Sequence, residues 1–128
     1  MAKKFATVFG WIFVILGILG FFSNPVIGEA PGAWLMAGTA HNVVHLITGV
    51  IFLWVAYGSP MKSAGMLKLF GVIYLLVAII GFFSSTGSIL GLFMVNGADN
   101  WLHLVLGIIF LWGGMSKSSS AMNMGGGM

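Results

Sequence analysis

The sequence predicts an all-α membrane protein with four transmembrane helices. Of its 128 residues, 59% are hydrophobic and only 5% are charged, whereas soluble domains carry about 25% charged residues. A helix needs about 20 apolar residues to cross a hydrocarbon core about 30 Å thick. Four stretches satisfy this length, at residues 5–23, 40–58, 66–84 and 99–115. Backbone groups in lipid must be hydrogen-bonded internally, so helices are the expected structure for such long and evenly apolar runs.

The first two spans resemble the last two, which predicts a duplicated helical hairpin. "FGWIFVILGILGFFS" at 9–23 and "FGVIYLLVAIIGFFS" at 70–84 share eight of fifteen positions. "AHNVVHLITGVIFLW" at 40–54 and "ADNWLHLVLGIIFLW" at 98–112 share nine of fifteen. A sequence that repeats in this way indicates two similar structural units.

The predicted four-helix domain therefore covers residues 1–115, with repeat one at about 5–58 and repeat two at about 66–115. Each repeat contains two spans, so both have the same orientation in the membrane and form a parallel repeat, which disfavours the inverted arrangement of many transporters. The remaining segment, residues 116–128, lacks apolar periodicity and is predicted to be a flexible cytoplasmic tail.

The lysines predict the orientation of the chain. In a four-span arrangement all of them fall on one side of the membrane, which the positive-inside rule assigns to the cytoplasm together with both termini; they are Lys3, Lys4, Lys62, Lys68 and Lys117. A lysine pair before an apolar run also occurs in cleaved signal peptides, but the match between spans one and three favours retention of span one. The location we expect is the plasma membrane of a bacterium.

The composition excludes several classes of function. There is no Cys, so thiolate metal sites and cysteine nucleophiles are absent. Glu29 and Asp99 are the only acids, which leaves little for paired-carboxylate catalysis, and no hydrolase, P-loop or HExxH motif occurs. The lysines are scattered and form no nucleic-acid-binding face. We expect a protein that is not an enzyme and binds no nucleic acid.

The connections on the outer side, residues 24–39 and 85–98, are longer and apolar, and we expect them to fold partly back over the bundle. Within the spans, small residues recur seven positions apart, as expected for a left-handed bundle with close helix packing. These predicted packing positions are Gly10, Gly17, Gly49, Ala56, Gly71, Ala78, Gly107 and Gly114.

Two of the three histidines occupy the same place in the repeat. His41, His45 and Gly49 are spaced by four and lie on one helical face, and Asp99, His103 and Gly107 have the same spacing. If the glycines face the bundle, so do these polar residues. The candidate polar cluster at the outer end therefore consists of His41, His45, Asp99 and His103.

Several interpretations of this cluster stay open. Asn42 and Asn100, or Thr39 and Asp99, are placed to cap the helix starts, with the histidines bonding a neighbouring loop or helix. Alternatively, the histidines and Asp99 bind zinc, copper or iron, or His45 and His103 are the axial ligands of a haem. A proton or small-substrate path is a further alternative.

The repeated NxxHLxxG core, "NVVHLITG" and "NWLHLVLG", resembles a family of small four-span bacterial membrane proteins known only as a domain of unknown function. The resemblance covers nearly the whole chain except the tail and implies a bacterial origin and a four-helix fold, without an activity or cofactor. Asn42, His45, Asn100 and His103 match the family-like core. His41 and Asp99 are features of this sequence.

The leading functional hypothesis is a structural role in the membrane, as a homo-oligomer or as an accessory subunit of a larger complex. Small size and glycine-rich helix faces favour such lateral association. The first alternative is a haem- or metal-binding protein with His45 and His103 as ligands. The second is a small transporter or channel, which with four spans would need to oligomerise to form a pore.

Overall fold

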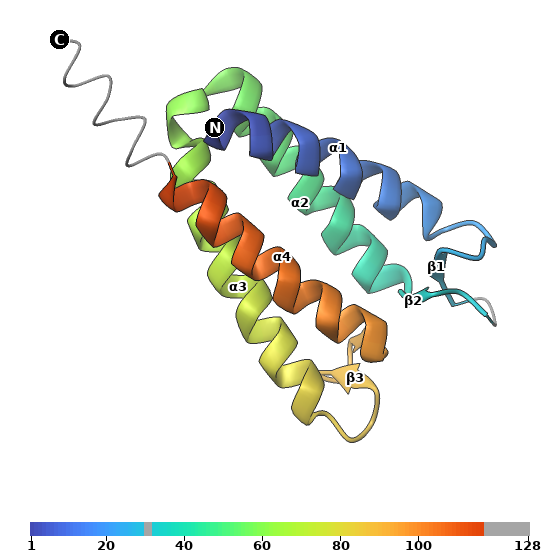
Figure 1. The fold of residues 1–128 in the computed structure, drawn as a ribbon. Coiled ribbons are helices and arrows are strands. Elements are labelled where there is room, and N and C mark those ends of the chain that lie inside the picture. The colour runs from blue at the N-terminus through green and yellow to red at the C-terminus, as the bar shows by residue number, and fades with distance from the viewer. Residues whose placement is uncertain (30–31, 117–128) are drawn as a thin grey trace, which may run out of the picture.

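The structure, a computed structural model, describes residues 1–29 and 32–116. Four long helices dominate it (Figure 1): α1 (Ala2–Leu19), α2 (Thr39–Gly58), α3 (Ser63–Phe83) and α4 (Gly97–Met115). Each helix is long and apolar enough to cross a membrane, so the prediction of a four-span membrane protein is confirmed. The predicted tail, apart from Ser116, lies outside the described residues.

The helices pack as two hairpins, with α1 mainly against α2 and α3 mainly against α4. A short 3₁₀ turn, Pro60–Lys62, joins the hairpins at one end of the bundle, here called the connection end. The longer connections within each hairpin lie at the opposite end, here called the loop end (Figure 1). The described lysines all belong to the connection end, at the start of α1 or close to the start of α3. Glu29 and Asp99 belong to the loop end.

Glycines allow the two helices of each hairpin to approach closely. A Cβ atom built on Gly49 would lie 2.7 Å from the carbonyl oxygen of Gly10, and one on Gly107 would lie 3.0 Å from that of Gly71. Real Cβ atoms do not approach backbone as closely as 2.7 Å, so the Gly49 contact requires glycine, and the Gly107 contact is tighter than most real Cβ contacts. All eight predicted packing positions are buried. The glycine contacts named here lie within a hairpin.

Aromatic side chains fill the space between the two hairpins. Phe52 of α2 and Phe110 of α4 have ring centroids 5.3 Å apart, and Phe13 of α1 lies 5.6 Å from Tyr74 of α3. These rings meet edge to face, an arrangement that their quadrupoles favour. The four side chains have no more than 5% of their surface exposed, so the core of the molecule lies where the hairpins meet.

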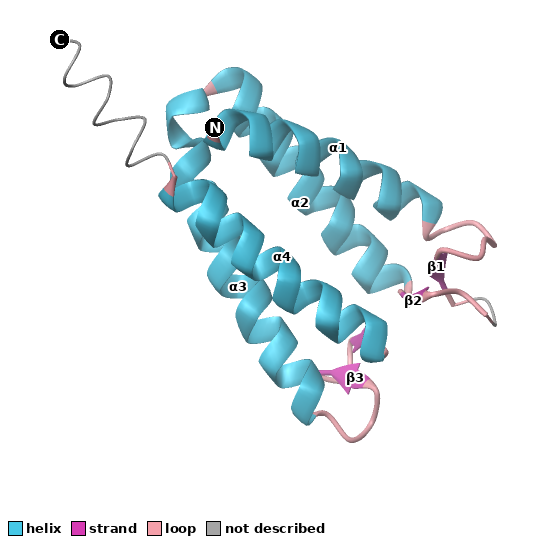
Figure 2. Cartoon of the chain, viewed as in Figure 1, coloured by secondary structure: helices cyan, strands magenta, loops and turns pink. Residues whose placement is uncertain are grey.

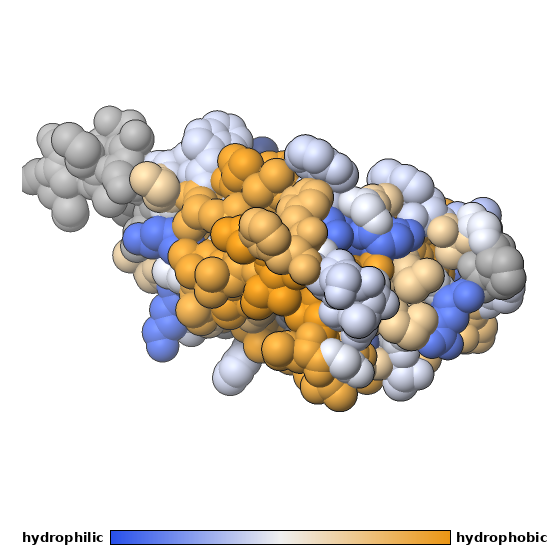
Figure 3. Space-filling model, turned by 90° about the horizontal axis from the view of Figure 1, so that it is seen from below, coloured by the Kyte–Doolittle hydropathy of each residue, from blue (hydrophilic) through white to orange (hydrophobic). Residues whose placement is uncertain are grey.

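The outer surface of the four helices is apolar, as contact with lipid requires. Leucine, isoleucine, valine and phenylalanine side chains from all four helices are exposed. In Figure 3 a broad area of hydrophobic side chains covers the middle of the visible face, and hydrophilic side chains lie toward both ends. An apolar middle with polar ends is the pattern of a protein that spans a bilayer.

The sequence did not predict the short strands of the loop end (Figure 2). In the first loop β1 (Ile27–Gly28) pairs in parallel with β2 (Leu35–Met36), and in the second β3 (Ser88–Ile89) pairs antiparallel with β4 (Phe93–Met94). Strands of two residues have no alternating pattern to detect. The first loop folds back as expected, because its buried residues Ile27, Leu35 and Ala37 pack against α1 and α4 through Leu16, Leu19, Ala98 and Leu102.

Helix α1 ends at Leu19, four residues before the predicted limit, because Asn24 organises a turn there. Its Nδ2 donates to the carbonyl oxygens of Leu19, Phe22 and Ile27 at 2.7–2.9 Å. Its Oδ1 accepts from the backbone N–H groups of Val26 and Ile27. One side chain thus bonds backbone groups on both sides of the turn. The apolar sequence of residues 20–23 did not indicate that the helix would end before them.

Candidate functional site

The three histidines come together at the loop end of the bundle, between the two hairpins. His41 and His45 come from successive turns of α2, and His103 comes from α4. One potential ligand atom from each lies within 4.8 Å of the other two. All three side chains are buried, with 5–6% of their surface exposed. Here they are called the histidine cluster, and their convergence agrees with the arrangement expected from the spacing of residues along the two helices.

His41 is held in place by the second loop. Its Nδ1 lies 3.2 Å from the carbonyl oxygen of Met94 in β4. A carbonyl only accepts hydrogen bonds, so Nδ1 carries the proton and donates. The ring also interacts with the backbone of Met36 in the first loop. Metal-binding histidines are commonly oriented by such a bond from the ring nitrogen that does not bind the metal. The two loops therefore fix the orientation of the His41 ring within the cluster.

The other two histidines lack such a partner. Nδ1 of His45 and Nδ1 of His103 are buried and have no hydrogen-bond partner among the described residues. Their rings lie against aromatic side chains, His45 at 5.5 Å from Phe13 and His103 at 5.6 Å from Tyr74 between centroids. A buried polar nitrogen without a partner is unfavourable by about 1–3 kcal/mol. A bound ligand would remove this penalty.

Asp99 lies outside the histidine cluster, although the sequence grouped it there. Its Oδ2 accepts hydrogen bonds from the backbone N–H of Asn96 and from that of Met36, both at 2.9 Å. The Asn96 side chain in turn accepts from the Asp99 N–H, which completes a capping box at the start of α4. The prediction of a site with four ligands is therefore wrong. The Asp99 carboxylate already accepts hydrogen bonds from backbone groups at the start of α4 and in the first loop.

The prediction that Asn42 and Asn100 cap their helices is also wrong. The N-cap of α2 is Gly38, with no side-chain hydrogen bond, and that of α4 is Asn96. The two predicted residues lie inside the helices, four positions after these caps. Asn42 packs closely on Gly20, and Asn100 packs in the same way on Gly81. Thr39 is the first residue of α2 and does not cap it either.

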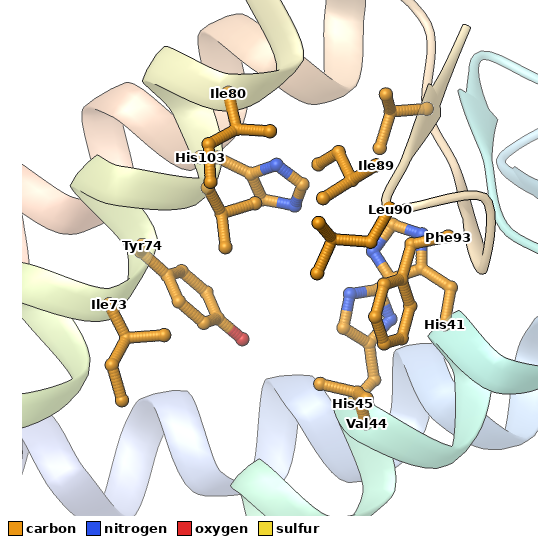
Figure 4. A pocket seen from close by; sticks show the side chains of 12 residues that line it. His41, Val44, His45, Ile73, Tyr74, Ile80, Ile89, Leu90, Phe93 and His103 are labelled. Atoms are coloured by element: carbon orange, nitrogen blue, oxygen red, sulfur yellow. The ribbon is translucent and has the colours of Figure 1, made fainter. Parts of the chain in front are cut away.

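A cavity of about 250 Å³ lies beside the histidine cluster. Its walls come from α2, α3, the second loop and, through His103, α4. The three imidazoles and the Tyr74 hydroxyl point toward its interior (Figure 4). Apart from these four side chains the lining is apolar: Val44, Ile73, Val77, Ile80, Ile89, Leu90, Phe93 and Val95. Sequence reasoning missed Tyr74, whose signal is a hydroxyl at the position where the first repeat has Phe13.

The geometry favours a single metal ion over a haem. A haem bound by His45 and His103 needs its macrocycle between the two imidazoles. The His41 ligand atom lies within 4.8 Å of both others, so the His41 ring would overlap the macrocycle. Neutral imidazoles are good ligands for zinc, copper, iron and nickel. Three of them leave a further coordination position open to a small molecule.

No curated protein and no solved structure matches the chain. A family model matches it from residue 3 to residue 116, which includes all four helices, both loops and the histidine cluster. That family is described only as a domain of unknown function, and its model brings no ligand or activity to the site. The chain belongs to this family, DUF4383.

Proposed function

We propose that the protein binds a late first-row transition-metal ion, such as zinc or copper, through His41, His45 and His103. The observation that supports this function best is the approach of three buried imidazoles to within 4.8 Å of one another inside the bundle. Burial of three polar rings without a ligand is unfavourable. A metal ion would give each ring a partner at once.

The fit to an ion requires a modest contraction of the histidine cluster. Ligand nitrogens of a tetrahedral site with metal–nitrogen bonds of about 2.1 Å lie about 3.4 Å apart. The present separations of up to 4.8 Å would close through small rotations of the His45 and His103 rings, whose Nδ1 atoms have no other partner among the described residues. His41 would act as the fixed ligand, because Met94 already orients its ring.

Cobalt binding tests this proposal directly. The protein, purified in mild detergent with an affinity tag that contains no histidine and stripped with a chelator, is titrated with Co²⁺. We expect one ion per chain and the visible absorption bands of a four-coordinate site, which added Zn²⁺ should abolish. His45→Ala and His103→Ala should each weaken binding at least tenfold, because each removes one of three ligands.

The matched control is Glu29→Gln, which removes an exposed potential ligand at the same end of the bundle and should leave the titration unchanged. The chain has only 3 His, so no other imidazole contributes background. Binding that persists in the His45→Ala, His103→Ala double variant would contradict the proposal, as would a folded protein that takes up no metal.

The same proposal includes the finer arrangement expected from the sequence. The bundle is a left-handed parallel repeat in the plasma membrane of a bacterium. The lysine-bearing connection end faces the cytoplasm, so the metal would be held near the outer face. The oligomeric or accessory-subunit role stays a prediction with less support than before, since glycines that suggested lateral association pack inside the hairpins. The transporter or channel hypothesis also stays a prediction.

A further inference from the structure

The cavity beside the histidine cluster has the properties of a binding site for a neutral lipophilic molecule. No charged side chain lines it. A charged headgroup or a fatty-acid carboxylate would therefore enter an apolar space without a counter-ion, which is strongly unfavourable. A neutral ligand that is largely apolar and has a few polar atoms suits such a lining.

The cavity walls reach the lipid-facing surface. Ile73 and Ile80 of α3 line the cavity and are 38% and 43% exposed, and Leu90 of the second loop is 78% exposed. Figure 4 labels all three side chains around the cavity. A ligand with an apolar tail is therefore able to enter sideways from the membrane and leave the tail among the lipids.

The inner part of the cavity offers hydrogen-bond donors between aromatic rings. The Tyr74 hydroxyl and the imidazoles of His45 and His103 point toward the cavity, and Phe93 lines its wall (Figure 4). Neutral imidazole and phenol groups donate hydrogen bonds to carbonyl oxygens. Aromatic side chains favour a planar ring in contact with them. We infer that the cavity binds a quinone-type headgroup, a neutral planar ring whose carbonyl oxygens face Tyr74 and the histidine cluster and whose apolar tail lies in the membrane.

The difference between the two loops explains why the cavity lies on this side. The first loop buries Ile27 and Leu35 against α1 and α4, and α1 carries Phe13, the counterpart of Tyr74 in the sequence repeat. The second loop is shorter and leaves Leu90 exposed over the cavity. Leu90 also has a positive φ of 56°, a conformation that non-glycine residues rarely adopt. The open cavity and the only tyrosine in the core thus occur together.

This inference goes beyond the metal site and does not require a metal, so both forms of the protein are used in the test. The probe is a benzoquinone with a ten-carbon tail, added to chelator-treated and to cobalt-loaded protein in nanodiscs, with binding measured by equilibrium dialysis. We expect saturable binding of one molecule per chain. A benzene ring with the same tail but no carbonyl oxygens should bind at least tenfold more weakly.

Two variants of α3 form the matched pair. Val77→Phe fills the cavity and should abolish saturable binding, whereas Val72→Phe places the same ring on the 50% exposed lipid side of the helix and should not. Tyr74→Phe keeps the packing and removes the hydroxyl, which also bonds the Thr48 side chain, and we expect an approximately five- to tenfold rise in Kd. This conservative variant serves as the test should Val77→Phe not fold.

The outcomes separate the two proposals. Quinone binding without a cobalt spectrum would support this inference and overturn the metal site. A cobalt spectrum without saturable quinone binding would support the metal site and overturn this inference. Equal binding of the quinone and its carbonyl-free analogue would show that the cavity accepts any acyl-like tail and would overturn the inference, as would equal effects of Val77→Phe and Val72→Phe.

Discussion

Asp99 of α4 accepts a hydrogen bond from the backbone N–H of Met36, which lies in the first loop, at 2.9 Å. A bond in the opposite direction joins His41 of α2 to the carbonyl of Met94 in the second loop. Met36 and Met94 are matched by the sequence repeat, and so are His41 and Asp99. Each hairpin is thus bonded to the loop of the other, and one of the two bonding side chains, His41, belongs to the histidine cluster.

Asp99→Ala should destabilise the protein by about 2–3 kcal/mol, because it removes the carboxylate that accepts from the N-cap residue Asn96 in the capping box and from Met36 in the first loop. The measurement is unfolding by SDS titration in mild detergent, followed by circular dichroism. Glu29→Ala, which removes the exposed acid of the same end, should change the midpoint little. Equal midpoints for the two variants would contradict a role of the Asp99 bonds in stability.

Asn24→Ala should destabilise the first loop strongly, by about 2 kcal/mol or more, because backbone groups in the turn after α1 lose their partners at once. Hydrogen exchange measured by mass spectrometry should show faster exchange in the first loop and unchanged exchange in the second. Ser85→Ala, an exposed polar residue of the second loop, is the control. Uniformly faster exchange in both loops would mean that Asn24 acts on the whole fold instead.

Two glycine substitutions should have opposite effects. A Cβ on Gly49 would lie 2.7 Å from backbone atoms of α1, whereas a Cβ on Gly65 meets nothing within 4 Å. Gly49→Ala should therefore destabilise the hairpin by more than 1 kcal/mol, and Gly65→Ala should stabilise α3 by up to about 1 kcal/mol through helix propensity. Thermal unfolding in the same detergent measures both. A harmless Gly49→Ala would show that the helices of the first hairpin separate easily.

Metal binding should stabilise the fold and hold the hairpins together. A ligand present at 100 times its Kd adds about 2.7 kcal/mol to the stability of the form that binds it. Since α2 and α4 both supply ligands, Zn²⁺ should raise the midpoint of SDS unfolding, and mild acid should reduce this gain because protons compete for the imidazoles. The His45→Ala variant should show a smaller gain with Zn²⁺, lower by about 1.4 kcal/mol for each tenfold rise in Kd; a gain of the same size as in the unaltered protein would indicate metal binding elsewhere.

The helices were predictable from the sequence because four long apolar runs leave little alternative in lipid. The ends of the helices were less predictable. Helix α1 ends early because the side chain of one polar residue, Asn24, bonds the backbone of the turn that follows. The cap of α4 was visible in principle, since Asn96 and Asp99 have the spacing of a capping box, but alignment on the repeated Asn100 drew attention away from it. The meeting of the histidines followed from helical spacing. The cavity did not, because it depends on how far each loop covers the bundle.

The crossed attachment of the loops also sets an order of assembly. While only the first hairpin has entered the membrane, the Met36 N–H lacks Asp99 and the His41 ring lacks Met94, since both partners belong to later parts of the chain. The loop end is therefore completed only after the fourth helix arrives. A truncated chain that carries α1 and α2 alone should insert into the bilayer yet leave its loop open to proteases, which would make the second hairpin an intramolecular chaperone for the first.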